Sequence, residues 1–257
     1  MPAHKPKRAK RVINYLPGGD HPDRDVWEKM KAHCRNLTPA AAISECAHLS
    51  AEYRRRFAMP EIDWKKIVAA LQAKKIPFVR TGAHGIATWT GRPRSTHDVG
   101  ILVKAGRNLQ RAVKTVEALY PELEKHNLFG VTAFFVPGER ESVIDVTYPH
   151  RADIEQTLET ATVVDVEGVQ VRVPKLEAAL ANKYGAMLVL NRDKIKRAQD
   201  AVDFATMVKH SLDEGRTPID MEWLRELGEL VWAGGGGEEI VRFVEQAKAG
   251  DVPNPNA

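Results

Sequence analysis

The chain has 257 residues, of which 43% are hydrophobic and 28% charged, and its formal net charge is +4. This balance is ordinary for a globular protein, and the length suits one large domain or a core with helical additions. No apolar run approaches the length of a membrane span, and two cysteines are too few for a disulfide framework. The basic N-terminus is followed by no apolar segment, so we expect a cytoplasmic protein with no secretory signal and no membrane partner.

Residues 1–24 combine proline, glycine and charge without periodicity, which predicts a disordered basic tail. The run "HKPKRAKR" in this tail is either a solvated, mobile segment or an arm that contacts RNA or phosphate. Residues 25–60 predict a helical extension, in which Thr38 is the expected N-cap and Pro39 the first helical residue.

Residues 61–160 contain the elements of an expected core. A helix is predicted in "EIDWKKIVAALQAKKI", a strand in "PFVRTG" and a further helix in "NLQRAVKTVEALYPEL". Two strands, "VTAFFVP" and "SVIDVTY", are separated by the turn signal "GERE". The order of these elements predicts an α/β (α+β) fold, a mixed β-sheet flanked by helices.

Residues 161–211 are expected to complete the core with a hairpin and two helices. The hairpin is "ATVVDVEGVQVRVP", which turns at Glu167-Gly168, and the helices begin near Lys175 and Lys194. Residues 212–257 predict a helical C-terminal segment and a tail, with Gly234–Gly237 as a flexible connector between helices.

The stretch "TGAHGIATWTGRPRSTHDVGILV" carries the strongest functional signal. Gly82 permits a sharp turn after the first strand, and a helix that starts there directs free N–H groups at an anion. Asp98 opens the next strand on the face of Gly100 and Leu102. Asp145 lies among apolar neighbours in "SVIDVTY", where an acid is costly unless it is paired or bound to metal. If the two strands are adjacent, Asp98 and Asp145 face one another.

These residues form a spaced set that resembles the nucleotidyltransferase superfamily of the DNA polymerase beta type, nearest the AbiEii-type toxins and the minimal nucleotidyltransferases. The resemblance covers roughly residues 62–210. It is carried by Gly82-Ala83, Gly91, Arg94-x-Thr96-x-Asp98 and Asp145, and it continues in Lys183, Arg192, Arg197, Asp200, Asp203 and Phe204.

The resemblance implies an enzyme that transfers NMP from an NTP to a hydroxyl on RNA or tRNA, a protein or a small molecule, with Mg²⁺ or Mn²⁺ as cofactor. It implies that Asp98 and Asp145 are the catalytic and metal-binding acids. The nucleotide would contact residues along the whole pattern: Gly82, Ala83, Arg94, Thr96 and Lys183. It also implies a toxin held by an antitoxin partner.

Four further residues have two interpretations each. His97 either contacts phosphate or is an ordinary loop histidine. Asp200 and Asp203 either support the site or form structural ion pairs on a helix with Lys196 and Arg197, and Arg197 is itself a supporting candidate.

Gly100 departs from the family pattern, because members normally carry a second acid there. Mg²⁺ binds through carboxylate oxygens, so the loss of one acid weakens the expected metal site. Two functions therefore stay open: an active nucleotidyltransferase, or a catalytically degenerate fold that binds nucleotides or a partner.

Overall fold

The structure is a computed structural model that describes residues 32–33 and 36–254. The expected basic tail and the first part of the N-terminal helical extension lie outside these residues. The strands are β1 (Phe78–Thr81), β2 (Val99–Val103), β3 (Glu124–Leu128), β4 (Val131–Phe135), β5 (Ser142–Thr147), β6 (Thr162–Val166) and β7 (Val169–Val173). The helices are α2 (Pro39–Arg56), α3 (Trp64–Ala73), α4 (Gly82–Thr90), α5 (Arg107–Leu119), α6 (Ala152–Thr160), α7 (Leu176–Leu188), α8 (Lys194–Ser211), α9 (Met221–Val231) and α10 (Gly236–Ala249).

Five strands form one mixed sheet in the order β1-β2-β5-β4-β3. Strands β2 and β5 are parallel, because the chain crosses over through α5 and the β3–β4 pair, and the other neighbours are antiparallel. Strands β6 and β7 form a separate hairpin that turns at Glu167-Gly168, both of which have positive φ. The predicted mixed sheet with flanking helices is confirmed.

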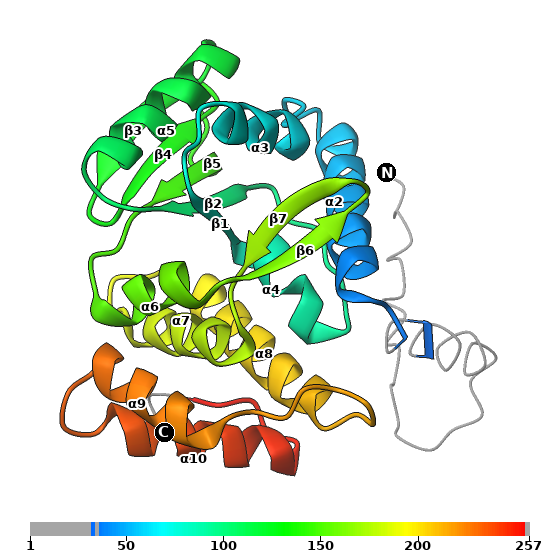
Figure 1. Ribbon diagram of the computed structural model, residues 1–257, viewed down its shortest axis with the longest axis vertical. Helices are drawn as coiled ribbons and strands as arrows, with labels where there is room; N and C mark the ends of the chain where they lie inside the picture. The colour runs from blue at the N-terminus through cyan, green and yellow to red at the C-terminus, as the bar shows by residue number, and fades with distance from the viewer. Residues whose placement is uncertain (1–31, 34–35, 255–257) are drawn as a thin grey trace, which may run out of the picture.

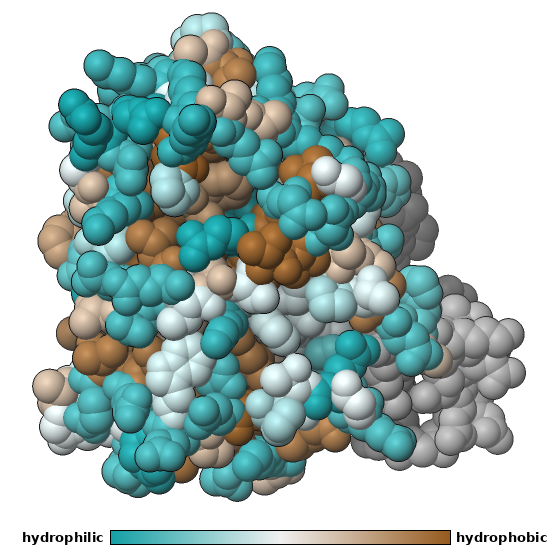
Figure 2. Space-filling model, viewed as in Figure 1, coloured by the Kyte–Doolittle hydropathy of each residue, from teal (hydrophilic) through white to brown (hydrophobic). Residues whose placement is uncertain are grey.

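Two apolar clusters hold the layers together. In the first, α3 and α5 pack against the sheet through residues such as Ile67, Val116 and Ile101. In the second, α7 to α10 pack together beneath α4 through residues such as Tyr184 and Phe243. Figure 1 shows this second cluster as a helical layer at the opposite end of the molecule from α3 and α5. Hydrophilic residues cover most of the face in Figure 2, with hydrophobic groups between them, as expected of a folded domain.

The helix starts follow from local capping. The Thr38 side chain accepts a hydrogen bond from the amide of Ala41 and Pro39 follows it, as predicted. Asp63 caps α3 in the same way by accepting from the amides of Lys65 and Lys66. Among the helices of residues 32–33 and 36–254, none combines the length and the hydropathy that crossing a bilayer requires.

The expectation of a flexible connector at Gly234–Gly237 is wrong in part. Gly236 and Gly237 belong to the first turn of α10 and are buried. A β-carbon on Gly236 would lie 2.1 Å from the carbonyl oxygen of Gly228, so α9 and α10 touch backbone to backbone. Glycine is needed there for close packing, which is the opposite of a loose linker.

Candidate active site

The site is built around the turn between β1 and α4. Gly82 has φ +65°, a conformation that residues with a side chain rarely adopt, and α4 begins at this residue. The first amides of α4 have no partner within the helix, so they and the helix dipole face the turn. A β-carbon on Gly82 would lie 3.8 Å from Oδ2 of Asp98. The turn at Gly82 and the carboxylate of Asp98 are therefore neighbours.

The two predicted acids come together across the parallel strands β2 and β5. Gly100 and Asp145 are paired in the register, so their side-chain positions share one face of the sheet. Asp98 lies two residues before Gly100 and falls on the same face. Burial raises the pKa of Asp145 to about 6, and the negative charge of Asp98 adds to this rise. Oδ1 of Asp145 is buried and has no hydrogen-bond partner among the described residues.

Asp98 is held by the residues that precede it. The hydroxyl of Thr96 donates to Oδ1 of Asp98, and the Thr96 amide donates to Oγ of Ser50 at 3.0 Å. The Sγ of Cys46 donates to the carbonyl oxygen of Arg94 at 3.1 Å. Ser50 and Cys46 belong to α2. The helical extension therefore positions the loop of residues 91–98 between α4 and β2, which contains Arg92 and Arg94 and is called the basic loop below. The sequence pattern contained no signal for this role.

The space of the missing acid is filled by Thr81. A β-carbon on Gly100 would lie 2.9 Å from Oγ1 of Thr81 and 3.3 Å from its carbonyl carbon and oxygen. Thr81 is paired with Gly100 in the antiparallel register of β1 and β2, so the two residues share a face. This threonine was not anticipated, because its importance depends on the strand register.

The carboxylates suit one divalent cation. Mg²⁺ accepts one or two carboxylates and keeps several of its waters, and the unpartnered Oδ1 of Asp145 provides an open ligand atom beside Asp98. Within the described part of the chain, no group of three or more His, Cys, Asp or Glu side chains is arranged to hold a metal ion. The donor set therefore fits a single Mg²⁺ or Mn²⁺ rather than a fully caged pair of ions.

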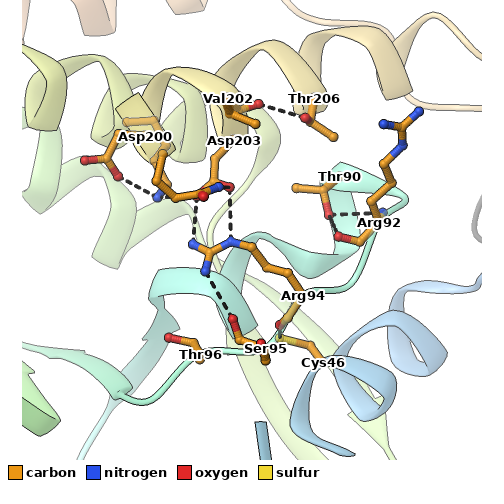
Figure 3. Close-up of polar contacts among 12 residues, drawn as sticks. Cys46, Thr90, Arg92, Arg94, Ser95, Thr96, Asp200, Val202, Asp203 and Thr206 are labelled. Atoms are coloured by element: carbon orange, nitrogen blue, oxygen red, sulfur yellow. Dashed lines mark hydrogen bonds and ion pairs between the residues drawn. The ribbon is translucent and has the colours of Figure 1, made fainter. Parts of the chain in front are cut away.

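An ion-pair network joins the basic loop to α7 and α8, as Figure 3 shows for Arg94 and Asp203. Arg94 donates to both carboxylate oxygens of Asp203, at 3.2 and 3.0 Å. Lys183 Nζ lies 2.8 Å from Asp200 and 2.7 Å from Asp203, and Arg192 pairs with Asp200 at 2.7 Å. Burial opposes ionisation of Asp203, but Lys183 and Arg94 outweigh it and lower its pKa. Lys183 and Arg94, the two cations that the resemblance assigns to nucleotide binding, are therefore both paired with carboxylates in this network.

Asp200 and Asp203 form ion pairs, as one of their two interpretations predicted, but the predicted partners Lys196 and Arg197 are wrong. Lys196 pairs with Glu141 at 3.3 Å instead of with Asp200 or Asp203, and Nε2 of His97 lies 3.6 Å from the same glutamate. Arg197 lines a different hollow, which includes Pro253 and the C-terminal end of the described chain. Arg197 therefore lies apart from the acids, whereas His97 lies next to them.

Two arginines and a histidine lie buried around the site, and the two arginines were not expected there. Arg54, Arg80 and His84 are 4%, 1% and 2% exposed. Burial lowers the pKa of Arg80 to about 10, while Cys46 and Asp98 act in the opposite direction. Burial and the neighbouring guanidinium groups hold the pKa of His84 well below its usual value, so this imidazole is neutral. In the sequence these residues look like ordinary polar positions.

No protein-family model matches the sequence, and no curated protein matches it. Solved structures are similar in fold. An antigenic nucleotidyltransferase-like protein from Paracoccidioides brasiliensis shares 14% identity with a TM-score of 0.43, over 79% of this chain and 93% of that chain. The antibiotic-resistance factor ANT(2'')-Ia shares 14% identity with a TM-score of 0.42, over 63% of this chain and 85% of that chain. JHP933 from Helicobacter pylori shares 16% identity with a TM-score of 0.38, over 72% and 87% respectively. These three likenesses have 14–16% identity and TM-scores below 0.5, and the chemistry proposed for this chain rests on its own residues.

Proposed function

We propose that this chain transfers NMP from an NTP to a hydroxyl acceptor on RNA, a protein or a small molecule. One observation carries the proposal: the parallel pairing of β2 with β5 puts Asp98 and Asp145 on one face of the sheet, beside the Gly82 turn. An anion-binding helix start next to two carboxylates is the combination that a metal-bound triphosphate needs.

Each residue has a distinct task in this reaction. The first amides of α4, from Ala83 onward, donate to phosphate oxygens of the NTP. Asp98 and Asp145 would hold one Mg²⁺ or Mn²⁺, and the bound ion would neutralise part of the phosphate charge. Asp145 accepts the proton of the acceptor hydroxyl as its oxygen forms a bond to the α-phosphorus. The bond from the α-phosphorus to the bridging oxygen breaks, and pyrophosphate leaves.

In the proposed reaction, Lys183 and Arg94 would support the triphosphate from the side of α7 and α8. In the structure, Asp200 and Asp203 neutralise both cations. Phosphate oxygens must therefore compete with these carboxylates, and we assign the primary phosphate contacts to the amides of α4. The resemblance extends the proposal to a toxin whose activity an antitoxin partner restrains.

The test is transfer of label from NTPs to total RNA or protein in the presence of Mg²⁺ or Mn²⁺. Asp98→Asn and Asp145→Asn should each reduce transfer by at least about 100-fold, because each removes a direct ligand. Glu139→Gln is the matched control, since Glu139 is an exposed acid of the β4–β5 connection. Equal transfer by the wild type and both aspartate variants would refute the proposal.

A second candidate function is nucleotide or partner binding without turnover. Thr81 favours it, because this side chain fills the place where the family pattern has an acid. In that case ATP binds in a calorimetric titration, Ala83→Pro weakens the binding by removing an amide donor, and no acceptor is labelled under any metal condition.

A further inference from the structure

A cavity of about 370 Å³ lies between α2, the start of α3 and the tip of the β6–β7 hairpin, and neither Asp98 nor Asp145 lines it. Figure 1 shows the hairpin tip reaching across to these two helices. Its apolar walls come from Ala51, Met59, Ile62 and Trp64. Clefts of this size commonly hold small organic ligands.

Arg54 gives this cavity a buried positive charge. The residue lines the cavity and is 4% exposed. Its Nε donates to the carbonyl oxygen of His97 at 3.4 Å, but its Nη2 is buried and has no hydrogen-bond partner among the described residues. Leaving a buried donor of a charged group unsatisfied is costly, and an anion in the cavity would offset that cost.

The other charges of the cavity are already balanced or lie at its rim. Nζ of Lys65 is 2.5 Å from the carboxylate of Glu167, and the Asp63 carboxylate caps α3. Arg55 and Glu61 are exposed at the mouth, where water screens them. On its buried side, the cavity therefore presents the charge of Arg54, which the negative charge of Asp98 opposes from the side of the acids.

We propose that this cavity is a second ligand site, which binds a small organic anion. Its phosphate or carboxylate contacts Arg54, and its apolar part lies against Met59 and Ile62. Because Arg54 also holds the carbonyl of His97, the residue before Asp98, the cavity and the acids share one connecting side chain. The ligand site is separate from the turn at Gly82 and does not depend on the transfer reaction.

The experiment is a calorimetric titration of the full chain with phenyl phosphate, with benzyl alcohol and inorganic phosphate as comparison probes. Phenyl phosphate should bind at one site, and benzyl alcohol should not bind. Arg54→Met keeps an unbranched apolar stem and removes the guanidinium group with its charge, so it should weaken binding by about tenfold or more. Arg55→Met, the neighbouring exposed arginine, should change binding by less than about threefold.

Ala51→Trp tests the cavity without altering Arg54, which covers the case in which Arg54→Met fails to fold. Ala51 is exposed on α2 and lines the cavity, so an indole there fills the space. Ala51→Trp should abolish the binding of phenyl phosphate, and Asp98→Asn should leave this binding in place. Undiminished binding by Ala51→Trp, equal binding of inorganic phosphate and phenyl phosphate, or no binding by the wild type would each overturn the proposal.

Discussion

Gly100→Asp restores the acid of the family pattern, and the structure determines what this change should cost. The new β-carbon would lie 2.9 Å from Oγ1 of Thr81, so Thr81 must move. Overpacking of this kind destabilises by about 1–3 kcal/mol. The added carboxylate also faces Asp98 and Asp145, and like charges in one site oppose ionisation. Without metal, we expect the free energy of unfolding to fall by about 2–4 kcal/mol, measured by urea denaturation in EDTA.

Adding Thr81→Ala to Gly100→Asp separates the cost of overpacking against Thr81 from the cost of repulsion between the carboxylates. It removes Oγ1, so the double variant should regain about 1–2 kcal/mol of the loss caused by Gly100→Asp alone. The double variant should also bind Mg²⁺ about tenfold or more tightly than the wild type, because a third carboxylate joins the site. Full stability of the single Gly100→Asp variant would refute the placement of Thr81. Unchanged Mg²⁺ affinity of the double variant would refute the placement of the acids.

Three further predictions concern buried charge. The folded pKa of Asp145 is about 6 against an ordinary 3.8, so stability is lost as pH rises through 6. Asp145→Asn should therefore stabilise the metal-free protein by about 3 kcal/mol at pH 7.5, with no gain at pH 4, in urea denaturation. Asp203→Asn leaves Arg94 without its charged partner and Lys183 with Asp200 alone, and should cost about 3–5 kcal/mol, seen as a lower Tm. Because His84 is neutral when folded, unfolding takes up a proton below pH 6.5. His84→Leu should flatten the loss of stability on acidification by up to about 1.4 kcal/mol per pH unit.

The parts of the fold that could be predicted have a local signal. Thr38-Pro39 and Asp63 mark helix starts through capping, and Glu167-Gly168 marks a hairpin turn through positive φ. Strand β3 has no such signal. All five of its residues are exposed and polar positions do not alternate with apolar ones, so only its pairing with β4 makes it a strand. Helix α6 was also missed, since its two buried residues, Asp153 and Thr157, are polar.

The residues of the candidate site also differ in whether the sequence carries a local signal for them. Gly82 and Asp98 are close in sequence and could be placed from their pattern, and Asp145 could be placed only on the assumption that two distant strands are adjacent. The structure confirms that adjacency. Arg54 and Arg80 could not be found, because a buried arginine differs from a surface arginine only in its three-dimensional surroundings. Such residues become visible when it is known that α2 packs against α4 and that Arg80 lies over the ring of Trp64.

The charges around Asp98 explain why the site suits one cation. In the proposed site, the pairing of β2 with β5 brings two carboxylates together, those of Asp98 and Asp145, and Mg²⁺ is commonly bound by one or two carboxylates plus substrate phosphates. Arg54 and Arg80 add positive charge behind Asp98, and both interact with its carboxylate. A second divalent ion would meet this field without a further acid to hold it, since Thr81 fills the place at Gly100. In the proposed reaction, the guanidinium groups of Arg54 and Arg80 would therefore supply part of the positive charge that a second metal ion brings.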